Sequence, residues 1–209
     1  MRCSVLRAPA NEGARRLGSS MSRYLIAGLG NPGSKYDQTR HNIGFRALER
    51  LAQRHRIALT STKFDSLCET GRIGDQMVVL LEPQTFMNRS GKAVSQAANF
   101  YEVDADHIIV IHDDIDLAPG TLRVKSGGGH GGHNGLRDIV AKLGSREFLR
   151  LRMGVGRPEH GDVTNHVLGR FTRGEFTVVD EMVESACDAV ETILADGLSA
   201  AQNRFNSRE

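Results

Sequence analysis

The chain has 209 residues, 39% of them hydrophobic and 25% charged, and its formal net charge is only +2, as is ordinary for a soluble globular protein. No apolar run approaches the roughly 20 residues that cross a bilayer, which excludes a helical membrane span. The three cysteines are scattered and odd in number, which indicates a reducing compartment and excludes a disulfide framework.

The first 20 residues differ from the rest in composition. They hold four arginines and one acidic residue and have no apolar segment of the kind found in secretory signals. Two alternatives remain: a weak organelle-targeting peptide, or a stretch upstream of a working start at Met21. We expect residues 1–20 to be a disordered extension or untranslated, and residues 21–209 to form the folded domain.

From Ser22 onward the hydrophobic pattern alternates between strands and helices. Strands are predicted over residues 23–28, 66–73, 76–82, 107–112, 120–125 and 149–156. Helices are predicted over residues 39–54, 88–101, 134–143, 174–195 and 197–205. The apolar run 108–111 is typical of a strand buried on both faces, and the break at Gly74-Asp75 predicts a hairpin. The fold class is therefore α/β: one domain with a twisted, mixed and mostly parallel sheet, flanked by helices on both sides.

A glycine-rich turn, Gly28-Leu29-Gly30-Asn31-Pro32-Gly33, follows the first predicted strand and spells G-x-G-x-x-G. A dinucleotide site would also need a helix that opens inside the turn and an acid at the end of a second strand. Here the next helical pattern starts only near Thr39, which we expect to cap it, and Glu49 falls inside that helix. Gly33-Ser34-Lys35 also has the wrong order for a P-loop, so we expect no nucleotide site.

Polar side chains gather at the ends of these elements. They are Asn31, His41-Asn42, Asn88, His112-Asp113-Asp114 and His133-Asn134. Ligands of open α/β sheets bind outside the carboxyl ends of the strands, so these groups are expected to converge. Each also has a simpler interpretation, because asparagine at a helix start often serves only as a cap, as Asn88 and Asn134 would.

Charge is distributed unevenly along the chain. Residues 123–157 hold eight basic and two acidic side chains, whereas residues 102–116 hold six acids and no lysine or arginine. A concentrated basic stretch is typical of a surface that contacts a phosphate backbone. The alternative is that these are solvated charges on unrelated faces.

Three kinds of chemistry are compatible with these residue types. Metal ligation by His112, Asp113, His130 and His133 is disfavoured because the last two lie in a segment, residues 127–135, with six glycines and no helical spacing. A nucleophilic triad is disfavoured because no serine lies in a G-x-S-x-G elbow. Water activated by a histidine remains, with a carboxylate to orient the ring and asparagine amides to bind a carbonyl oxygen.

Five motifs resemble one family in order and spacing, from about Arg23 to Asn206. They are Gly28 to Gly33 with Tyr36, Thr39-Arg40-His41-Asn42, Thr85-Phe86-Met87-Asn88-Arg89-Ser90-Gly91, His112 to Leu117, and the glycine-rich segment Gly127 to Gly135. The chain closely resembles bacterial-type peptidyl-tRNA hydrolases. The resemblance implies hydrolysis of the ester that joins a peptide to the terminal ribose of tRNA, in the cytoplasm, by a monomer without cofactor, metal, membrane or obligate protein partner.

The same resemblance implies roles for individual residues. His41 matches the general base, Asp113 its orienting carboxylate, and Asn31 a position linked to recognition of the peptide. The positions that match contacts to the tRNA 3′ CCA end are Tyr36, Phe86, Met87, Asn88 and Asn134. Lys125 and Arg152 match a clamp on the 5′-phosphate of the acceptor stem, and both lie in the basic stretch found above.

One departure from the family pattern is Asp114, which stands where many relatives carry glutamate. The main rival hypothesis is an RNA-binding module that has lost catalysis. The retained His41, Asp113, Asn31 and Asn88 argue against it, since a binding module has no need of a water-activating set.

Overall fold

The computed structural model describes residues 23–158 and 160–206. The expectations for residues 1–20 and for the start at Met21 lie outside these residues. A seven-stranded sheet forms the middle layer, in the order β2-β3-β4-β1-β5-β7-β6. The strands are β1 (Arg23–Gly28), β2 (Thr62–Lys63), β3 (Ser66–Ile73), β4 (Gln76–Pro83), β5 (Ile108–Asp114), β6 (Leu122–Ser126) and β7 (Leu149–Gly154).

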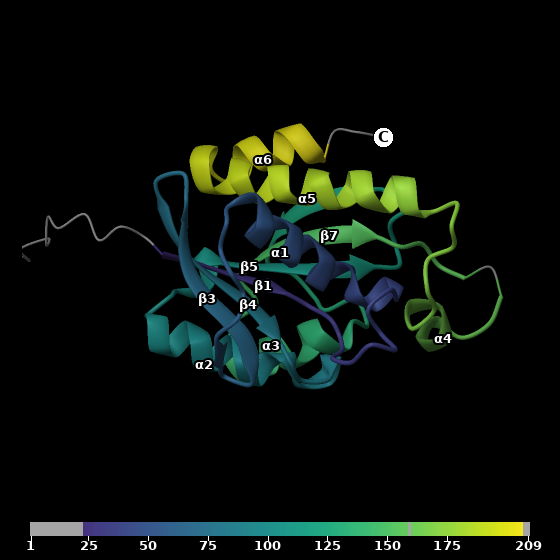
Figure 1. Ribbon diagram of the computed structural model, residues 1–209, viewed down its shortest axis with the longest axis horizontal. Coiled ribbons are helices and arrows are strands. Elements are labelled where there is room, and N and C mark those ends of the chain that lie inside the picture. Colours follow the sequence, from purple (N-terminus) through teal and green to yellow (C-terminus); the bar gives the residue numbers. More distant parts are fainter. Residues whose placement is uncertain (1–22, 159, 207–209) are drawn as a thin grey trace, which may run out of the picture.

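The helices cover both faces of this sheet (Figure 1). They are α1 (Ile43–Arg54), α2 (Ser90–Tyr101), α3 (Asn134–Leu143), α4 (Val163–Val167), α5 (Phe176–Asp196) and α6 (Leu198–Phe205). Three short 3-10 turns precede α1, α2 and β5: η1 (Arg40–Asn42), η2 (Met87–Arg89) and η3 (Ala105–His107). The predicted α/β class and two-sided helical cover are confirmed.

The four central strands β4, β1, β5 and β7 run parallel, whereas β2, β3 and β6 add antiparallel pairs at the two edges. The expectation of a mostly parallel sheet therefore holds for its centre, while three of the six neighbouring pairs are antiparallel. The predicted hairpin is β3–β4, with Ile73 opposite Gln76. Strand β2, turn η3 and helix α4 were not predicted, since all three are too short to show a period.

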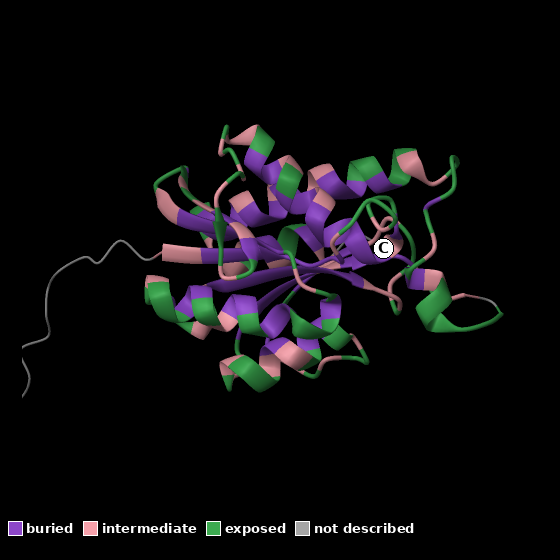
Figure 2. Cartoon of the chain, turned by 60° about the horizontal axis from the view of Figure 1, so that its bottom comes forward, coloured by how far each residue is buried: buried purple, intermediate pink, exposed green. Residues whose placement is uncertain are grey.

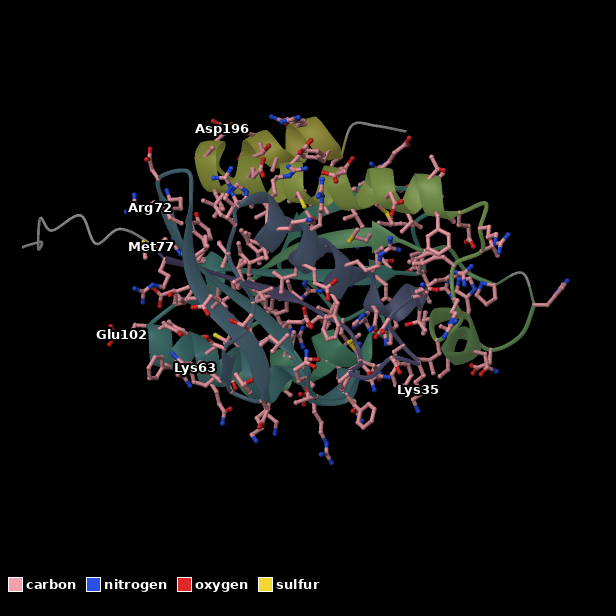
Figure 3. All side chains as sticks on the ribbon, viewed as in Figure 1. Lys35, Lys63, Arg72, Met77, Glu102 and Asp196 are labelled. Atoms are coloured by element: carbon pink, nitrogen blue, oxygen red, sulfur yellow. The ribbon has the colours of Figure 1, made fainter. Side chains whose placement is uncertain are left out.

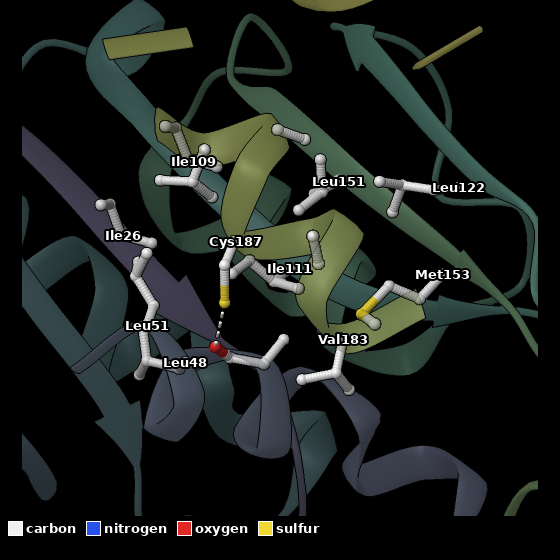
Figure 4. Close-up of a cluster of buried hydrophobic side chains, with 14 of the residues drawn as sticks. Ile26, Leu48, Leu51, Ile109, Ile111, Leu122, Leu151, Met153, Val183 and Cys187 are labelled. Atoms are coloured by element: carbon white, nitrogen blue, oxygen red, sulfur yellow. Dashed lines mark hydrogen bonds between the residues drawn. The ribbon is translucent and has the colours of Figure 1, made fainter. Parts of the chain in front are cut away.

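Two apolar cores lie on the opposite faces of the sheet, and the buried residues of Figure 2 form bands along the strands and inner helix faces. One core joins α1, α5 and α6 to the sheet, and the other joins α2 and α3. In the first core the Cys187 thiol donates to the Ala47 carbonyl at 3.7 Å, which ties α5 to α1 (Figure 4). Alternate residues of β5 enter alternate cores, which explains its continuous apolar sequence.

The glycines of the opening turn allow close packing. A Cβ on Gly28 would lie 2.4 Å from the carbonyl oxygen of Gly44, and one on Gly30 would lie 2.6 Å from the Phe45 ring. The start of α1 therefore rests directly on the end of β1. This contact brings the His41 turn against the Asn31 loop, and it confirms that the turn does not open a helix of its own.

Candidate active site

A cavity of about 790 Å³ lies where the parallel strands end, and residues of α4 form part of its lining. Of the predicted site residues, the cavity is lined by Asn31, His41, Phe86, Met87, Asn88, Asp113, Lys125, Asn134 and Arg152. Tyr36 is absent from this lining: it lies in the β1–η1 loop, with the ammonium of Lys35 4.7 Å from its ring centroid. Lys35 lies on the α4 side of the molecule in Figure 3.

A buried carboxylate holds two histidines at the centre of this cavity. His41 Nδ1 is 2.8 Å from Asp113 Oδ1, and His133 Nε2 is 3.0 Å from the same oxygen. Asp113 follows Ile109 and Ile111 on the α1 face of β5, because side chains of a strand alternate between faces. His41 lies in the turn η1, which leads directly into α1, and α1 packs on that face of the sheet. The two residues therefore meet although 72 positions separate them.

Hydrogen bonding fixes the tautomers of these two rings. His133 Nδ1 accepts the backbone N–H of Leu136 at 3.3 Å, so its Nε2 carries the proton donated to Asp113. His41 likewise donates its Nδ1 proton to the carboxylate, and its Nε2 is left with a lone pair. A neutral His41 is therefore prepared to accept a proton at Nε2.

Burial and charge act in opposite directions on the pKa values of this pair. Burial lowers the pKa of His41, but the charge of Asp113 and its hydrogen bond outweigh burial and raise that pKa above the ordinary value. Burial raises the pKa of Asp113, yet His41 and His133 hold it far below its usual range. The carboxylate is thus ionised at neutral pH and stabilises a protonated His41.

The neighbouring His112 has a different role. Its Nδ1 donates to the backbone carbonyl of Asp113 at 2.8 Å, and its ring lies edge-on to His133 with centroids 5.0 Å apart. Burial and the nearby His133 lower the pKa of His112 to about 3, so it stays neutral. His112 therefore supports the strand end that carries Asp113.

Asn31 is held by Asn42 and Met87. The Asn42 side chain accepts from Asn31 N and donates to Asn31 O, both at 2.9 Å, as a neighbouring strand would. Asn31 Oδ1 accepts the backbone N–H of Met87 at 2.8 Å, which fixes the amide orientation, because an N–H can only face an oxygen. No acceptor for the Asn31 NH₂ group is found within residues 23–158 and 160–206, and Asn31 lines the cavity.

The simpler interpretations of three polar residues are wrong. Thr39 does not cap the helix: its hydroxyl donates to the Tyr36 carbonyl at 2.8 Å, and the cap positions of η1 and α1 have no side-chain cap bond. Asn88 lies inside η2, and Arg89 occupies the cap position of α2. The cap of α3 is His133, so Asn134 is its first residue. Asn88 and Asn134 are both exposed and free of a capping role.

The basic stretch divides into two groups. Lys125 is exposed, and Arg152 lies at the cavity with its Nε 2.7 Å from Asp114 Oδ2, so its terminal nitrogens remain available. Arg150, in contrast, is buried and donates to the carbonyls of Gly128 and Gly129. Arg150 therefore supports the glycine-rich segment and is not part of a phosphate-facing surface.

Sequence reasoning placed His133 and Asn42 among the polar groups expected to converge and considered His133 as a metal ligand. It did not predict that His133 shares Asp113 with His41 or that Asn42 holds the Asn31 backbone. A signal in the sequence is the repeated His-Asn dipeptide, His41-Asn42 and His133-Asn134. In the structure the two histidines come from separate elements and both contact the carboxylate of Asp113.

A metal could be considered for the same side chains. Within the described part of the chain, His41, Asp113 and His133 offer ligand atoms that all lie within 4.8 Å of one another. The set differs from the one weighed above, since His130 Nδ1 accepts the backbone N–H of Gly132 instead. Both ring nitrogens that face Asp113 carry the protons of its hydrogen bonds, so a cation would have to displace them.

Comparison with known proteins identifies the family. A family model described as peptidyl-tRNA hydrolase matches residues 25–209. The chain is 50% identical over 188 residues to a peptidyl-tRNA hydrolase of Trichlorobacter lovleyi, covering 90% of this chain and 97% of that protein. It is 47% identical over 183 residues to one of Alkaliphilus oremlandii, covering 88% and 99%.

A solved structure agrees with these relatives. The crystal structure of peptidyl-tRNA hydrolase from Acinetobacter baumannii superposes with a TM-score of 0.85 at 43% identity, covering 92% of this chain and 99% of the other. The family model and the relatives both span nearly the whole chain from β1 onward. This chain therefore belongs to the peptidyl-tRNA hydrolase family.

Proposed function

We propose that this chain hydrolyses the ester bond of peptidyl-tRNA with His41 as the general base. The observation that carries the mechanism is the His41 Nδ1–Asp113 Oδ1 hydrogen bond of 2.8 Å in a cavity wall, because it leaves Nε2 to accept a proton. The activity itself follows from family membership, and the product pair is a free tRNA and a free peptide.

The reaction has two steps in this scheme. A water molecule gives one proton to His41 Nε2, and its oxygen bonds to the ester carbonyl carbon. The carbon–oxygen bond to the terminal ribose then breaks, and the leaving ribose oxygen takes the proton from His41. Asp113 stays ionised throughout and stabilises the protonated ring between the steps.

Asn31 is proposed to bind the peptide next to the reacting ester. Its NH₂ group is oriented by the hydrogen bond from Met87 N to Asn31 Oδ1, while Asn42 holds the Asn31 backbone. The NH₂ group can donate to a peptide carbonyl without adding charge. An amide donor at this position supports recognition of a peptide in preference to a single amino acid with a free ammonium group.

The tRNA side of the cavity is proposed to involve an aromatic side chain and two basic ones. Phe86 is 55% exposed at the cavity and offers a face on which a terminal base can stack. Asn88 and Asn134 offer amides in the same cavity lining, which also includes Met87. Tyr36 lies outside this lining and would contact the 3′ CCA end from the β1–η1 loop. Lys125 and Arg152 would contact the 5′-phosphate, which positions a substrate without reading its sequence.

The decisive experiment is a turnover assay on an N-blocked aminoacyl-tRNA with the wild type and with His41→Ala. We expect the wild type to release the blocked amino acid, and His41→Ala to lose turnover while circular dichroism and melting temperature show a folded protein. Near-normal kcat in His41→Ala would refute the assignment of the base. An inactive wild type that still binds tRNA would favour the RNA-binding module.

The same assay tests the proposal that no metal is needed. We expect activity to survive dialysis against EDTA, provided that magnesium is restored to keep the tRNA folded. A loss that returns only with zinc or manganese would assign a metal to His41, Asp113 and His133 instead.

The chain is further proposed to act as a monomer in the cytoplasm. Both faces of the sheet are covered by the chain's own helices, and Cys68 and Cys187 are buried free thiols. Within the described residues, no helix is long and apolar enough to cross a membrane. Sedimentation of the purified protein tests the oligomeric state, and fractionation of cells tests the location.

A further inference from the structure

Arg40 precedes His41 in the chain, and its side chain connects the turn η1 to the segment Gly169–Glu175. Arg40 Nη2 lies 2.8 and 3.0 Å from the two carboxylate oxygens of Glu175. Arg40 Nη1 donates to the Arg170 carbonyl at 2.9 Å. The side chain of Arg40 is only 11% exposed, so solvent screens this contact little.

The backbone reinforces the same connection. Arg40 N donates to the Gly169 carbonyl at 3.0 Å, and Thr39 and Arg170 form an isolated antiparallel bridge. The Arg40 guanidinium also lies 5.2 Å from the centroid of the Phe171 ring. Three successive residues, Gly169 to Phe171, are therefore fixed to the turn that carries His41.

The segment held by Arg40 follows directly on a wall of the cavity. Val163, Thr164, Val167 and Leu168 line the cavity, and Leu168 is adjacent to Gly169. This wall belongs to α4 and its flanks, which lie apart from the two helical layers in Figure 1. A short helix outside both layers buries few apolar side chains that could fix its position. The position of this wall therefore depends on the contacts that attach α4 and its flanks to the rest of the domain.

From these contacts we infer that Arg40 is a positioning residue, which sets the 163–168 wall at a fixed distance from His41 so that the scissile ester is held between them. The inference rests on the proposed function only in placing the reacting ester beside His41. Arginine suits the task because its planar fork binds both oxygens of Glu175 and a backbone carbonyl at once, which a lysine cannot do. Displacement of a reacting group by about 1 Å can cost as much as 100-fold in rate.

The alternative is that Arg40–Glu175 merely joins the starts of α1 and α5, from the turn η1 to the cap position of α5, as other pairs join the two helices. Arg46–Asp180, Arg50–Glu184 and Arg54–Asp188 bridge these helices in the same way. Arg46 makes a matched control, since its 2.8 Å contact with Asp180 also links α1 to α5 but reaches no residue of 163–171. Replacing it by lysine tests the effect of an arginine-to-lysine change in one interhelical ion pair by itself.

The experiment is a double-mutant cycle between the Arg40–Glu175 ion pair and Leu168 of the 163–168 wall. The kcat and KM of each variant are measured on a blocked aminoacyl-tRNA. The single variants are Arg40→Lys, Glu175→Gln and Leu168→Ala, with Arg46→Lys as the control. We expect Arg40→Lys and Glu175→Gln to lower kcat/KM by roughly 10- to 100-fold, and Arg46→Lys to change it less than twofold. In the Leu168→Ala background, Arg40→Lys should cost less than half as much on a logarithmic scale, because the wall is already impaired.

The pH profile separates this role from a direct effect on the base. If Arg40 acts through the wall, the acid midpoint of kcat/KM stays within about 0.2 units of the wild-type midpoint in Arg40→Lys. The inference would be overturned if the logarithmic losses of kcat/KM from Arg40→Lys and Leu168→Ala were fully additive. It would also be overturned if Arg40→Lys shifted the acid midpoint of kcat/KM or left kcat/KM unchanged. If Arg40→Lys fails to fold, Glu175→Gln decides by the same criteria. A failed assignment of His41 would instead appear as an active His41→Ala variant, which this cycle does not involve.

Discussion

His133 donates its Nε2 proton to the same oxygen of Asp113 that accepts the Nδ1 proton of His41, at 3.0 and 2.8 Å. The carboxylate therefore divides its negative charge between two donors, of which His41 is the proposed general base. This sharing weakens the attraction of Asp113 for a protonated His41, so we expect His133 to influence the pH at which His41 becomes neutral.

Replacing His133 should consequently move the pH profile upward. In His133→Ala the carboxylate loses one donor and binds protonated His41 more strongly, which raises the pKa of His41 and shifts the acid midpoint of kcat/KM to higher pH. His133→Gln, whose amide can still donate, should retain more of the wild-type midpoint. A midpoint that is unmoved or lower in His133→Ala would contradict this account. Loss of the cap bond to Leu136 N should also cost about 1 kcal/mol of stability in both variants.

The wild-type profile has a predicted direction of its own. His41 must be neutral to accept a proton, so kcat/KM falls as pH drops through its pKa. Because Asp113 raises that pKa over the opposing effect of burial, the acid midpoint should lie above the ordinary histidine value of about 6.5. Asp113→Asn removes the charge and should lower kcat by several orders of magnitude. A wild-type midpoint clearly below 6.5 would show that burial dominates instead.

The local sequence predicted most residues of this site, but it did not predict which distant residues pair with one another. The motifs around His41 and Asp113 could each be recognised, and the strand pattern indicated that both lie near the carboxyl ends of the parallel strands. The sharing of Asp113 by His133 was not predictable, because it depends on how the glycine-rich segment folds back over β5. The burial of Arg150 was missed for the same reason, since charge counting does not tell an inward arginine from an outward one.

Helix boundaries illustrate the same limit on a smaller scale. The predicted helix 39–54 contains η1 and α1, and the predicted helix 88–101 overlaps η2 and contains α2. In both cases a 3-10 turn carries the polar residues, His41 and Asn88, ahead of the regular helix. The hydrophobic periodicity continues through such a turn. It therefore predicts that a helix is present, but not the residue at which the 3-10 turn becomes an α-helix.

Glu82 gives a prediction on stability. Its side chain is buried at the end of β4 with one oxygen bonded by Gln84 Nε2 at 2.8 Å and the other unpartnered. Burial and the nearby charge of Glu49 raise the pKa of Glu82 to about 7. A carboxyl with a raised folded-state pKa is favoured in its protonated form, so stability is greatest below the unfolded pKa and declines as pH rises towards 7.

Glu82→Gln should therefore raise the melting temperature relative to the wild type, and the gain should grow between about pH 4.5 and pH 7 and then level off. The control is Glu69→Gln on the neighbouring strand β3, where hydrogen bonds from Ser61 and Thr70 lower the pKa of Glu69. That variant should show no such gain. Thermal melts of the three proteins across pH 4 to 9 would decide, and a constant difference at all pH values would count against titration of Glu82.

Arg152 gives the last prediction, on tRNA binding. Its Nε donates to Asp114 Oδ2 at 2.7 Å, and Arg152 and Lys125 both line the cavity. If Arg152 contacts a phosphate, Arg152→Ala should weaken tRNA binding and reduce the slope of log K against log salt by about 0.7 to 0.9. Asp114→Asn, which frees the guanidinium without removing it, should leave that slope nearly unchanged. Arg72→Ala is the control, because Arg72 is exposed at the far end of the molecule from Lys35 (Figure 3). Equal slopes for the wild type and Arg152→Ala would exclude a phosphate contact there, whatever the loss of affinity.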